Sequence, residues 1–578
     1  MILLIPAVAL ALLQTSGDSS QGFDGSPLKR PQRVDIPFNR LYGNAELLGH
    51  FDALQAAWPE LVSMEVIGHS TEGRELRVYT LNNASTGAAA DKPAMWVDAN
   101  VHGNEIQGGE ATLYLAWYLL ENYGHNPRTT ELLDRAAFYI QPIINPDGRY
   151  HWVHDAHGSS SSRTGYEPTD NDRDGRFDED PADDLDGDGH ITSMRKYVPG
   201  EGTHRLNADD PRIMERVPSN DKGIRGDWIY LGSEGIDNDG DGRFNEDSVG
   251  GYDMNRAWPA LYRPGHVQYG AGPYPLYWPE TRAVAEFLYA HPNVAAVQSF
   301  HNSGGMILRG PGSEAYGDYD YADLRAFDEL GKNGEKMLPF YSYMILWKDL
   351  YPVFGGFATW TYEGLGIISF TNELWTSSRM FPDEEGRADR RWFDDHLLSG
   401  GGYIEWHPVQ HPFYGEIEVG GYRKDFGRVP PTFLIEEMVH RNALFCIEHA
   451  EAMPEVKILS VDITPLANGV KAIDVIFRND RVIPTRTGRS ASKGIGEPDT
   501  FTIEGEGLEV LAGGFRSDRW RPERIELAER EPARLLRESG IKGREELRVR
   551  WFVTGRGTAR IGWSGETGRN KRVDVEIP

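Results

Sequence analysis

Residues 96–120 read WVDANVHGNEIQGGEATLYLAWYLL, an apolar stretch interrupted by one polar turn. The residues before the turn are typical of a buried strand and those after it have helical spacing, so the stretch predicts a strand followed by a helix. The turn carries His102 and Glu105, separated by Gly103 and Asn104. Because α/β proteins build their sites where strands end, we expect both side chains to face one metal ion there.

Strand and helix patterns alternate along most of the chain, which predicts an α/β domain with a mixed, twisted sheet flanked by helices. We place this domain at residues 24–454. Strand-like runs occur at 64–83 (a hairpin), 93–101, 136–146, 294–302 and 365–374, and helical spacing at 44–58, 279–291 and 432–453.

The texture changes after Pro454, where apolar and polar residues alternate between Gly and Asn turns. Residues 455–578 therefore predict a C-terminal β-sandwich, with residues 523–540 as its one possible long helix. This part has no cluster of His, Cys or acidic residues. We expect it to be a packing or docking module, and the sequence does not identify its partner.

Length and charge set outer limits on function. The chain of 578 residues predicts more than one domain, and its formal charge of −28 argues against nucleic acid as a partner. An apolar run at residues 2–13 favours a signal peptide over residues 1–20, hence a secreted or periplasmic protein. No later stretch has transmembrane length. Cys446, the only cysteine, lies in an apolar helical pattern, so we expect a buried structural thiol and no internal disulfide.

An acidic insertion over residues 165–250 repeats one motif three times. Each copy has Asp at relative positions 1, 3 and 5 and Gly at position 6, like the start of an EF-hand calcium loop. The bidentate Glu expected at position 12 is absent, and the alternative is a solvated acidic loop. We expect structural Ca²⁺, bound by Asp170, Asp172 and Asp174, by Asp184, Asp186 and Asp188, and by Asp237, Asp239 and Asp241.

The H-x-x-E pair needs further ligands to form a catalytic zinc site, because it is weak evidence alone. A second pair, His69 and Glu72, lies in a polar hairpin turn and is interpreted as surface. His301 follows an apolar strand directly and is the expected third ligand. The histidines of a polar loop are a less favoured metal site; they are His151, His154 and His157.

Other polar residues near strand ends supply the remaining parts of a hydrolytic site. Glu373 ends a strongly apolar strand, where a carboxylate is costly unless it is used or paired, so it is the candidate general base. Asn255 and Arg256 stand side by side in a turn and could bind a carboxylate.

These motifs, in this order, resemble the zinc carboxypeptidases of the carboxypeptidase A type, over about residues 38–453. The motifs are HGNE, INPDGR, YDMNRAW, SFHNSGG and ISFTNELW. The resemblance implies one catalytic Zn²⁺ on His102, Glu105 and His301, a water activated by zinc, and Glu373 as base. The substrates would be peptides with a free C-terminal carboxylate, from which the last residue is removed.

The resemblance also implies roles for residues that spacing alone does not single out. Tyr351, in YPVFGG, matches the mobile tyrosine that binds the substrate together with Asn255 and Arg256. Arg195, in ITSMRK, is the candidate for the arginine that stabilises the oxyanion. Ala358 matches the floor of the side-chain pocket, which favours apolar or aromatic C-terminal residues.

Two alternatives stay open at this point. One keeps the fold but acts on bacterial cell-wall peptides, as a peptidase or amidase. The other, from a different class, is a calcium-stabilised binding protein without catalysis. That second alternative predicts the loss of a zinc ligand or of the base, and all of these residues are present.

Overall fold

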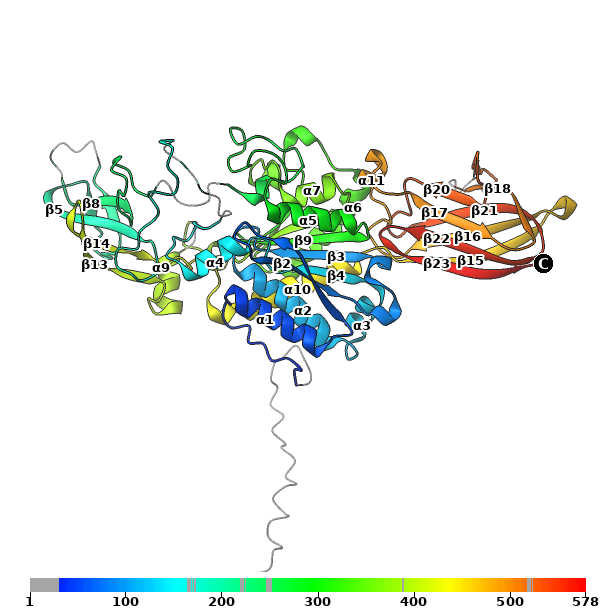
Figure 1. Ribbon diagram of the computed structural model, residues 1–578, viewed down its shortest axis with the longest axis horizontal. Helices are drawn as coiled ribbons and strands as arrows, with labels where there is room; N and C mark the ends of the chain where they lie inside the picture. The colour runs from blue at the N-terminus through cyan, green and yellow to red at the C-terminus, as the bar shows by residue number, and fades with distance from the viewer. Residues whose placement is uncertain are drawn as a thin grey trace, which may run out of the picture.

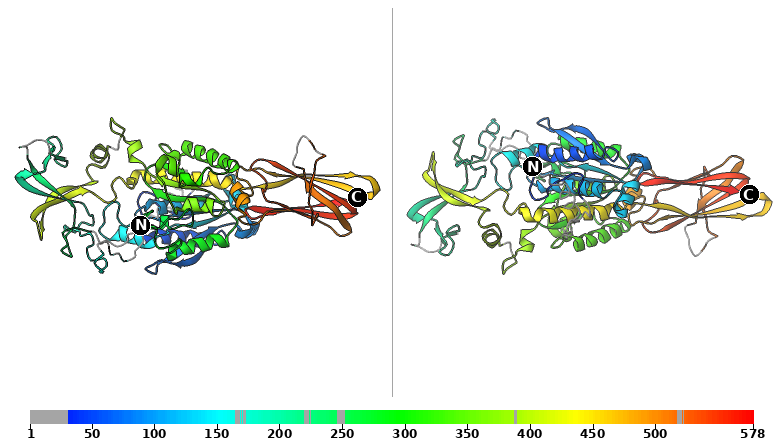
Figure 2. Two further views of the ribbon diagram at one scale, coloured as in Figure 1. Left: turned by 90° about the horizontal axis from the view of Figure 1, so that it is seen from above. Right: turned by 90° about the horizontal axis from the view of Figure 1, so that it is seen from below.

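The computed structural model describes residues 31–163, 168, 170, 173–218, 223, 225–245, 252–386, 389–516, 521 and 523–578. The expected signal segment lies outside these residues. Three parts follow one another along the long axis of the molecule (Figure 1): a six-stranded sheet, a central α/β domain and a C-terminal sandwich. Figure 2 shows the same three parts in a row from above and below. No helix in the described ranges is long and apolar enough to span a bilayer.

The central sheet has eight strands in the order β1-β2-β4-β3-β9-β12-β10-β11, and it is mixed. β3, β4, β9 and β12 are parallel to one another, whereas β1 pairs with β2 as an antiparallel hairpin. The strands are β1 (Val62–His69), β2 (Glu75–Leu81), β3 (Ala94–Ala99), β4 (Ala137–Gln141), β9 (Val294–Asn302), β10 (Met306–Arg309), β11 (Ser342–Ile345) and β12 (Ile368–Leu374).

Helices cover both faces of this sheet (Figure 1). One core contains Met95 and Val97 of β3 together with helices that include α2 and α10, and the other contains Trp96 of β3 together with α5 and α7. Alternate residues of one strand thus enter different cores, which explains why the strand is apolar throughout. The helices are α1 (Asn44–Ala57), α2 (Gln107–Asn122), α3 (Pro127–Arg135), α4 (Pro146–His154), α5 (Pro279–Ala290), α6 (Tyr321–Met337), α7 (Phe357–Glu363), α8 (Ser377–Met380), α9 (Arg390–Phe393) and α10 (Thr432–Glu451).

Short helical turns complete the connections. They are η1 (Ala84–Thr86), η2 (Ala89–Asp91), η3 (Met254–Arg256), η4 (Glu314–Tyr316), η5 (Leu346–Leu350), η6 (Asp394–Leu398) and η7 (Ala467–Gly469).

A second, antiparallel sheet was not expected from the sequence. It joins part of the acidic insertion to a hairpin from much later in the chain, in the order β13-β14-β5-β8-β6-β7. Met194, Ile417 and Val419 form its small core. The strands are β5 (Ser193–Gly202), β6 (His204–Leu206), β7 (Met214–Arg216), β8 (Gly226–Ser233), β13 (Tyr403–His411) and β14 (Gly415–Tyr422).

The C-terminal part is a sandwich of two antiparallel sheets, as the alternation after Pro454 predicts. One sheet has the order β15-β16-β21-β18-β19 and the other β20-β17-β22-β23. The elements are β15 (Val456–Pro465), β16 (Lys471–Asn479), α11 (Gly488–Lys493), β17 (Asp499–Glu504), β18 (Leu508–Phe515), β19 (Glu526–Leu527), β20 (Arg534–Arg537), β21 (Glu546–Gly555), β22 (Gly557–Gly565) and β23 (Gly568–Ile577).

The helix considered for residues 523–540 is wrong, because that segment contains strands β19 and β20. Pro532 disfavours a helix interior, and in β20 the side chain of Leu535 enters the sandwich core while Leu536 stays exposed. An alternation of period two is the property of a strand.

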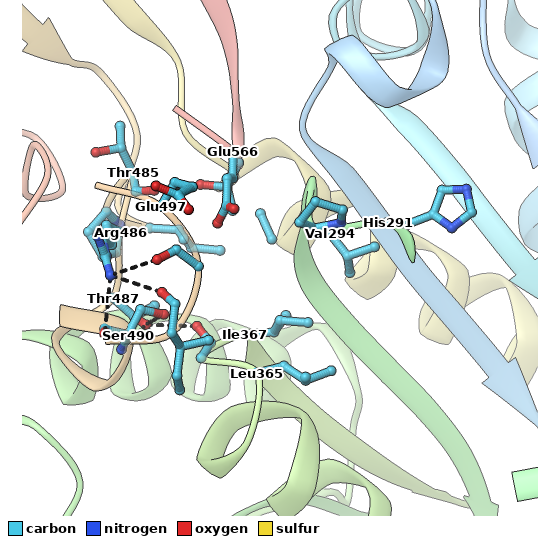
Figure 3. Close-up of a pocket in the computed structure, with 18 of the residues that line it drawn as sticks. His291, Val294, Leu365, Ile367, Thr485, Arg486, Thr487, Ser490, Glu497 and Glu566 are labelled. Carbon is cyan, nitrogen blue, oxygen red and sulfur yellow. Dashed lines mark hydrogen bonds between the residues drawn. The ribbon is translucent and has the colours of Figure 1, made fainter. Parts of the chain in front are cut away.

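The central domain and the sandwich line an open cavity of about 340 Å³ where they meet. Figure 3 shows Val294, Leu365 and Ile367 of the central domain across from Arg486 and Glu566 of the sandwich. Arg486 is engaged by the loop itself, since its Nη2 donates to the backbone oxygens of Ser490, Ile495 and Gly496. The cavity lies at the amino end of β9, whereas His301 stands near the opposite end of that strand.

Candidate active site

The turn that carries His102 and Glu105 connects β3 to α2, as the sequence predicts. Asn100 adopts a left-handed φ of 57° and donates from Nδ2 to the backbone oxygen of Glu105 at 2.6 Å, which closes the turn. Gly103 packs against the following loop so closely that a Cβ there would lie 2.3 Å from the carbonyl carbon of Gly148. The local sequence therefore requires glycine at this position.

Sheet topology explains why His301 and Glu373 meet the turn. β9 lies between β3 and β12 and is parallel to both, so the carboxyl ends of all three strands share one edge of the sheet. Within β9 and β12, His301 stands directly opposite Glu373. His102 and His301, which are 199 residues apart in sequence, thus become neighbours.

Three side chains converge at this edge. The Nδ1 of His102 lies 3.0 Å from Oε1 of Glu105, and the Nδ1 of His301 lies 3.0 Å from Oε2 of Glu105 and 3.2 Å from the Nδ1 of His102. All three residues are buried, with exposed fractions of 1–2%. Two imidazole nitrogens and a carboxylate that face one point fit a zinc ion, because they match the three-ligand set of catalytic zinc sites.

Asp253 holds the first of these histidines, and sequence reasoning missed it. Its Oδ1 lies 3.0 Å from Nε2 of His102, which fixes the proton on that nitrogen and leaves Nδ1 free to coordinate. Burial opposes ionisation of Asp253, but the neighbouring charges of His102 and Arg256 hold its pKa well below the usual range. The available signal was the acid two residues before Asn255 in YDMNRAW.

Glu373 stands beside the cluster with an unusual affinity for protons. Burial of the carboxyl and the negative charge of Glu105 raise the pKa of Glu373 to about 7. The charge of His301 acts in the opposite direction. A carboxyl that gains and loses a proton near neutral pH is suited to general acid–base work.

Arg195 does not reach the cluster. It lies in β5, opposite Glu418 of β14, and its Nε donates to the Glu418 carboxylate at 2.7 Å. Its guanidinium stacks between Trp228 and Trp406, at 4.4 and 4.2 Å from the ring centroids. The ITSMRK stretch belongs to the second sheet, which lies beyond the central domain's edge (Figure 1), so the expected place of Arg195 is corrected.

Arg163, and not Arg195, is an arginine that lies at the ligand cluster. Its Nη1 lies 2.7 Å from Oε1 of Glu105 and its Nε 3.6 Å from Oδ2 of Asp253. Burial disfavours the cation, but these two carboxylates raise the pKa of Arg163. Nothing in the run SSSSR marks this arginine by pattern; its only signal is a position shortly after the INPDGR turn.

The predicted carboxylate-binding residues also lie at this edge. The Nδ2 of Asn255 is 3.5 Å from Nε2 of His301, and its Oδ1 accepts from the backbone N–H of Phe357 at the start of α7. Arg256 is anchored by donation from Nη1 to the backbone oxygen of Asn255 at 2.8 Å. Ala358 is buried in α7, next to Phe357.

Tyr351 joins this group with a more open side chain. It directly follows η5, and 49% of its surface is exposed. Its hydroxyl is near enough to act electrostatically on Arg163. The YPVFGG turn after it packs against the backbone of Arg256, where a Cβ on Gly355 would lie 2.2 Å from the carbonyl oxygen.

The structure describes two of the three acidic motifs completely and the first one in part. Asp184, Asp186 and Asp188 can each direct one oxygen to a common region, with those atoms within 4.8 Å of one another. The same holds for the third motif, formed by Asp237, Asp239 and Asp241. In the first motif Asp172 lies outside the described residues, and only Asp170 and Asp174 are placed.

The other histidine patterns do not assemble into a metal site among the described residues. His69 and Glu72, the second H-x-x-E pair, are both exposed, as expected, and His151 pairs with Glu72 and Asp155. Burial lowers the pKa of His157 to about 4.

Comparison with known proteins agrees with this geometry. A family model described as zinc carboxypeptidase matches residues 47–190 and 230–392, which include the three ligands, Arg163 and Glu373 but not Arg195. A domain of unknown function, DUF8731, matches residues 455–576.

Individual relatives are similar to parts of the chain. Carboxypeptidase D of Homo sapiens is 29% identical over 131 residues, 23% of this chain and 10% of that protein. The inactive metallocarboxypeptidase ECM14 of Saccharomyces cerevisiae is 30% identical over 122 residues, 21% of this chain and 28% of that protein. The solved structure of carboxypeptidase A from Helicoverpa armigera aligns with a TM-score of 0.42 and 16% identity, covering 73% of this chain and 78% of that one.

The family match covers more than half of the chain, and the zinc-ligand triad lies within the matched ranges. This chain belongs to the zinc carboxypeptidase family.

Proposed function

We propose that the protein is an active metallocarboxypeptidase that hydrolyses the last peptide bond of substrates with a free C-terminal carboxylate. The observation that carries the proposal is the convergence of His102, Glu105 and His301 beside Glu373. Since one similar protein is named as inactive, the proposal depends on these residues and not on the family alone.

Zinc would be held by His102, Glu105 and His301, with Asp253 orienting His102. When bound, the ion supplies a Lewis acid that polarises the scissile carbonyl and acidifies water. Glu373 accepts the proton of the attacking water and passes it to the amine as the C–N bond breaks. Its pKa of about 7 suits a group that must take both roles near neutrality.

Arg163, and not Arg195, is proposed as the cation that stabilises the tetrahedral oxyanion. Support comes from its guanidinium, which lies 2.7 Å from the proposed ligand Glu105. A preorganised cation at the place where charge develops lowers the barrier more than it stabilises the neutral substrate.

Asn255, Arg256 and Tyr351 are proposed to bind the terminal carboxylate of the substrate. An Arg fork and an amide donor match a carboxylate, and this requirement would restrict cleavage to the chain end. Ala358 offers no charge at the proposed pocket floor, so we expect a preference for apolar or aromatic C-terminal residues.

The proposal includes structural Ca²⁺ in the acidic insertion, supported by the convergent carboxylates of Asp184, Asp186 and Asp188 and of Asp237, Asp239 and Asp241. Close carboxylates repel one another, so a divalent ion would stabilise each loop. The proposed location is secreted or periplasmic, on the basis of the apolar run at residues 2–13.

The proposal is tested with one peptide in two forms, one with a free C-terminal carboxylate and one with a C-terminal amide. A carboxypeptidase releases the last residue only from the free acid. Equal cleavage of both forms, or cleavage inside the chain, would show that the terminal carboxylate is not recognised.

A further inference from the structure

Arg428 reaches the zinc-ligand cluster from a segment outside the part of the chain that matches the family. It lies between β14 and α10, on a connection that leads from the second sheet back to the central domain. Its backbone oxygen accepts hydrogen bonds from Nε2 of Gln107 at 3.2 Å and from Nδ2 of Asn302 at 3.1 Å. The main chain of Arg428 is thus fixed to the first residue of α2 and to the residue after His301.

Within the described ranges, the guanidinium of Arg428 forms no close ion pair with a carboxylate. Its Nη1 donates to Oδ1 of Asn302 at 3.1 Å, and its Nη2 makes a long contact of 3.5 Å with Oγ of Ser160. Among the described residues, the one carboxylate within 4.0 Å is that of Glu105, 3.9 Å from Nη1, and it already faces Arg163 and both histidines.

This arrangement is costly for a cation. The side chain of Arg428 is only 18% exposed. A largely buried charge is stabilised only when an opposite charge and hydrogen bonds compensate for the lost water. An anion that arrives with the substrate would supply that compensation.

A series of ion-pair contacts connects Arg428 with Arg256. Arg256 and Asp253 lie 3.8 Å apart, Asp253 and Arg163 lie 3.6 Å apart, and Arg163 and Glu105 lie 2.7 Å apart. Arg428 follows Glu105 at 3.9 Å. Arg256 and Arg428 are therefore the first and last members of one series of ion-pair contacts that includes the zinc ligand Glu105.

The inferred direction of the substrate uses this order of contacts. If Arg256 binds the terminal carboxylate, the scissile bond lies near Glu105 and the preceding residues extend toward Arg428. We propose that Arg428 determines specificity by binding a carboxylate side chain of the penultimate residue, so that peptides with Asp or Glu before the last residue are preferred. A guanidinium recognises a carboxylate with two parallel hydrogen bonds, which a neutral amide cannot reproduce. This inference rests on the proposed carboxypeptidase function.

The test compares N-acetyl-Ala-Asp-Phe with N-acetyl-Ala-Asn-Phe, which differ in charge but hardly in shape. The zinc-loaded wild type should cleave the Asp peptide with a kcat/KM about tenfold higher, the value expected for one charge-assisted contact. Arg428→Gln should bring the ratio to about one and change the rate on the Asn peptide less than about threefold. Arg423→Gln, in the same segment but 43% exposed and paired with Asp425, is the matched control and should keep the wild-type ratio.

A binding measurement separates this inference from the proposed function. In a Glu373→Gln background, titration calorimetry should show the Asp peptide binding about tenfold more tightly than the Asn peptide, and adding Arg428→Gln should remove that difference. If Arg428→Gln does not fold, Arg428→Lys takes its place in the test. Lysine keeps the positive charge but not the planar guanidinium, so this variant should retain only part of the preference for the Asp peptide.

Equal ratios in the wild type and in Arg428→Gln would overturn the role of Arg428, as would a wild type without preference in both rate and binding. Selective binding of the Asp peptide without cleavage of either peptide by the wild type would support Arg428 and contradict the hydrolytic function instead.

Discussion

The Nε2 atom of His102 lies 3.0 Å from Oδ1 of Asp253, while the other ring nitrogen faces Glu105. The carboxylate of Asp253 thereby fixes the tautomer and the orientation of the ring. The acid comes from the same turn as Asn255 and Arg256, so one short motif serves both the metal ligand and the proposed carboxylate site.

Asp253→Asn should lower the affinity for zinc about 10- to 100-fold, because the substituted amide no longer stabilises the ligating form of His102. Competition with a chromophoric chelator measures the effect. Asp318→Asn, an exposed acid outside the site, should bind zinc like the wild type. An unchanged affinity in Asp253→Asn would remove Asp253 from the metal site.

Glu373→Gln should keep one zinc per chain and reduce kcat by about 10²- to 10⁴-fold, since the amide cannot accept the proton of water. Metal analysis and steady-state kinetics on the same preparation check both parts. A variant with nearly normal turnover would exclude Glu373 as the base.

Arg163→Gln and Arg195→Gln test which arginine acts at the oxyanion. The first should lose about 10²- to 10³-fold in kcat with zinc retained. The second should lower the melting temperature, because Arg195 stacks between Trp228 and Trp406, but leave kcat within about threefold of wild type. The reverse result would restore Arg195 to the mechanism.

Glu280→Gln should stabilise the protein at alkaline but not at acidic pH. Burial raises the pKa of Glu280 to about 7 in the folded state, whereas the carboxyl of an unfolded chain titrates near 4.3. Between these two pH values the carboxyl of Glu280 keeps its proton in the folded state but has lost it in the unfolded state. The contribution of this proton to the unfolding free energy of the wild type is therefore fully present below about pH 4 and is lost as the pH rises to about 7.

Gln is neutral throughout and escapes this loss, so the variant should gain up to about 4 kcal/mol in unfolding free energy above pH 7. Urea unfolding at pH 4 and pH 8 measures the difference, with Glu286→Gln of the same helix as an exposed control. A difference that stays constant with pH would contradict the assigned pKa.

Calcium should protect the acidic insertion from proteolysis. With a calcium-selective chelator, cleavage within residues 165–250 should accelerate, because the clustered carboxylates repel one another without a divalent ion. Mass spectrometry of the fragments locates the cuts. Identical digestion with and without calcium would argue for solvated acidic loops.

The sequence predicts those parts of the site that follow strand ends. His102, His301 and Glu373 each come after or at the end of an apolar run, and parallel strands bring such positions to one edge. Asn255 and Arg256 do not end a strand; the YDMNRAW motif, which lies in a turn, predicts them.

Other parts depend on contacts that leave no local pattern. Arg163 follows a serine run without periodicity, and only the folded loop brings it to Glu105. The residues around Arg195 match the expected motif. In the fold, however, Arg195 of β5 pairs with Glu418 of β14, more than two hundred residues away, in a sheet that no local sequence pattern predicts. The strands of that sheet are short or half exposed, so they lack the apolar runs that mark the central sheet.

The most direct test is to incubate the zinc-loaded protein with N-blocked dipeptides ending in Phe, Leu, Lys or Glu, with and without a zinc chelator. We expect release of the last residue that requires zinc, is fastest for the Phe and Leu peptides, and is abolished in Glu373→Gln. No release from any dipeptide by a protein that holds one zinc per chain would contradict the central claim, and would direct the search toward cell-wall peptides or amides.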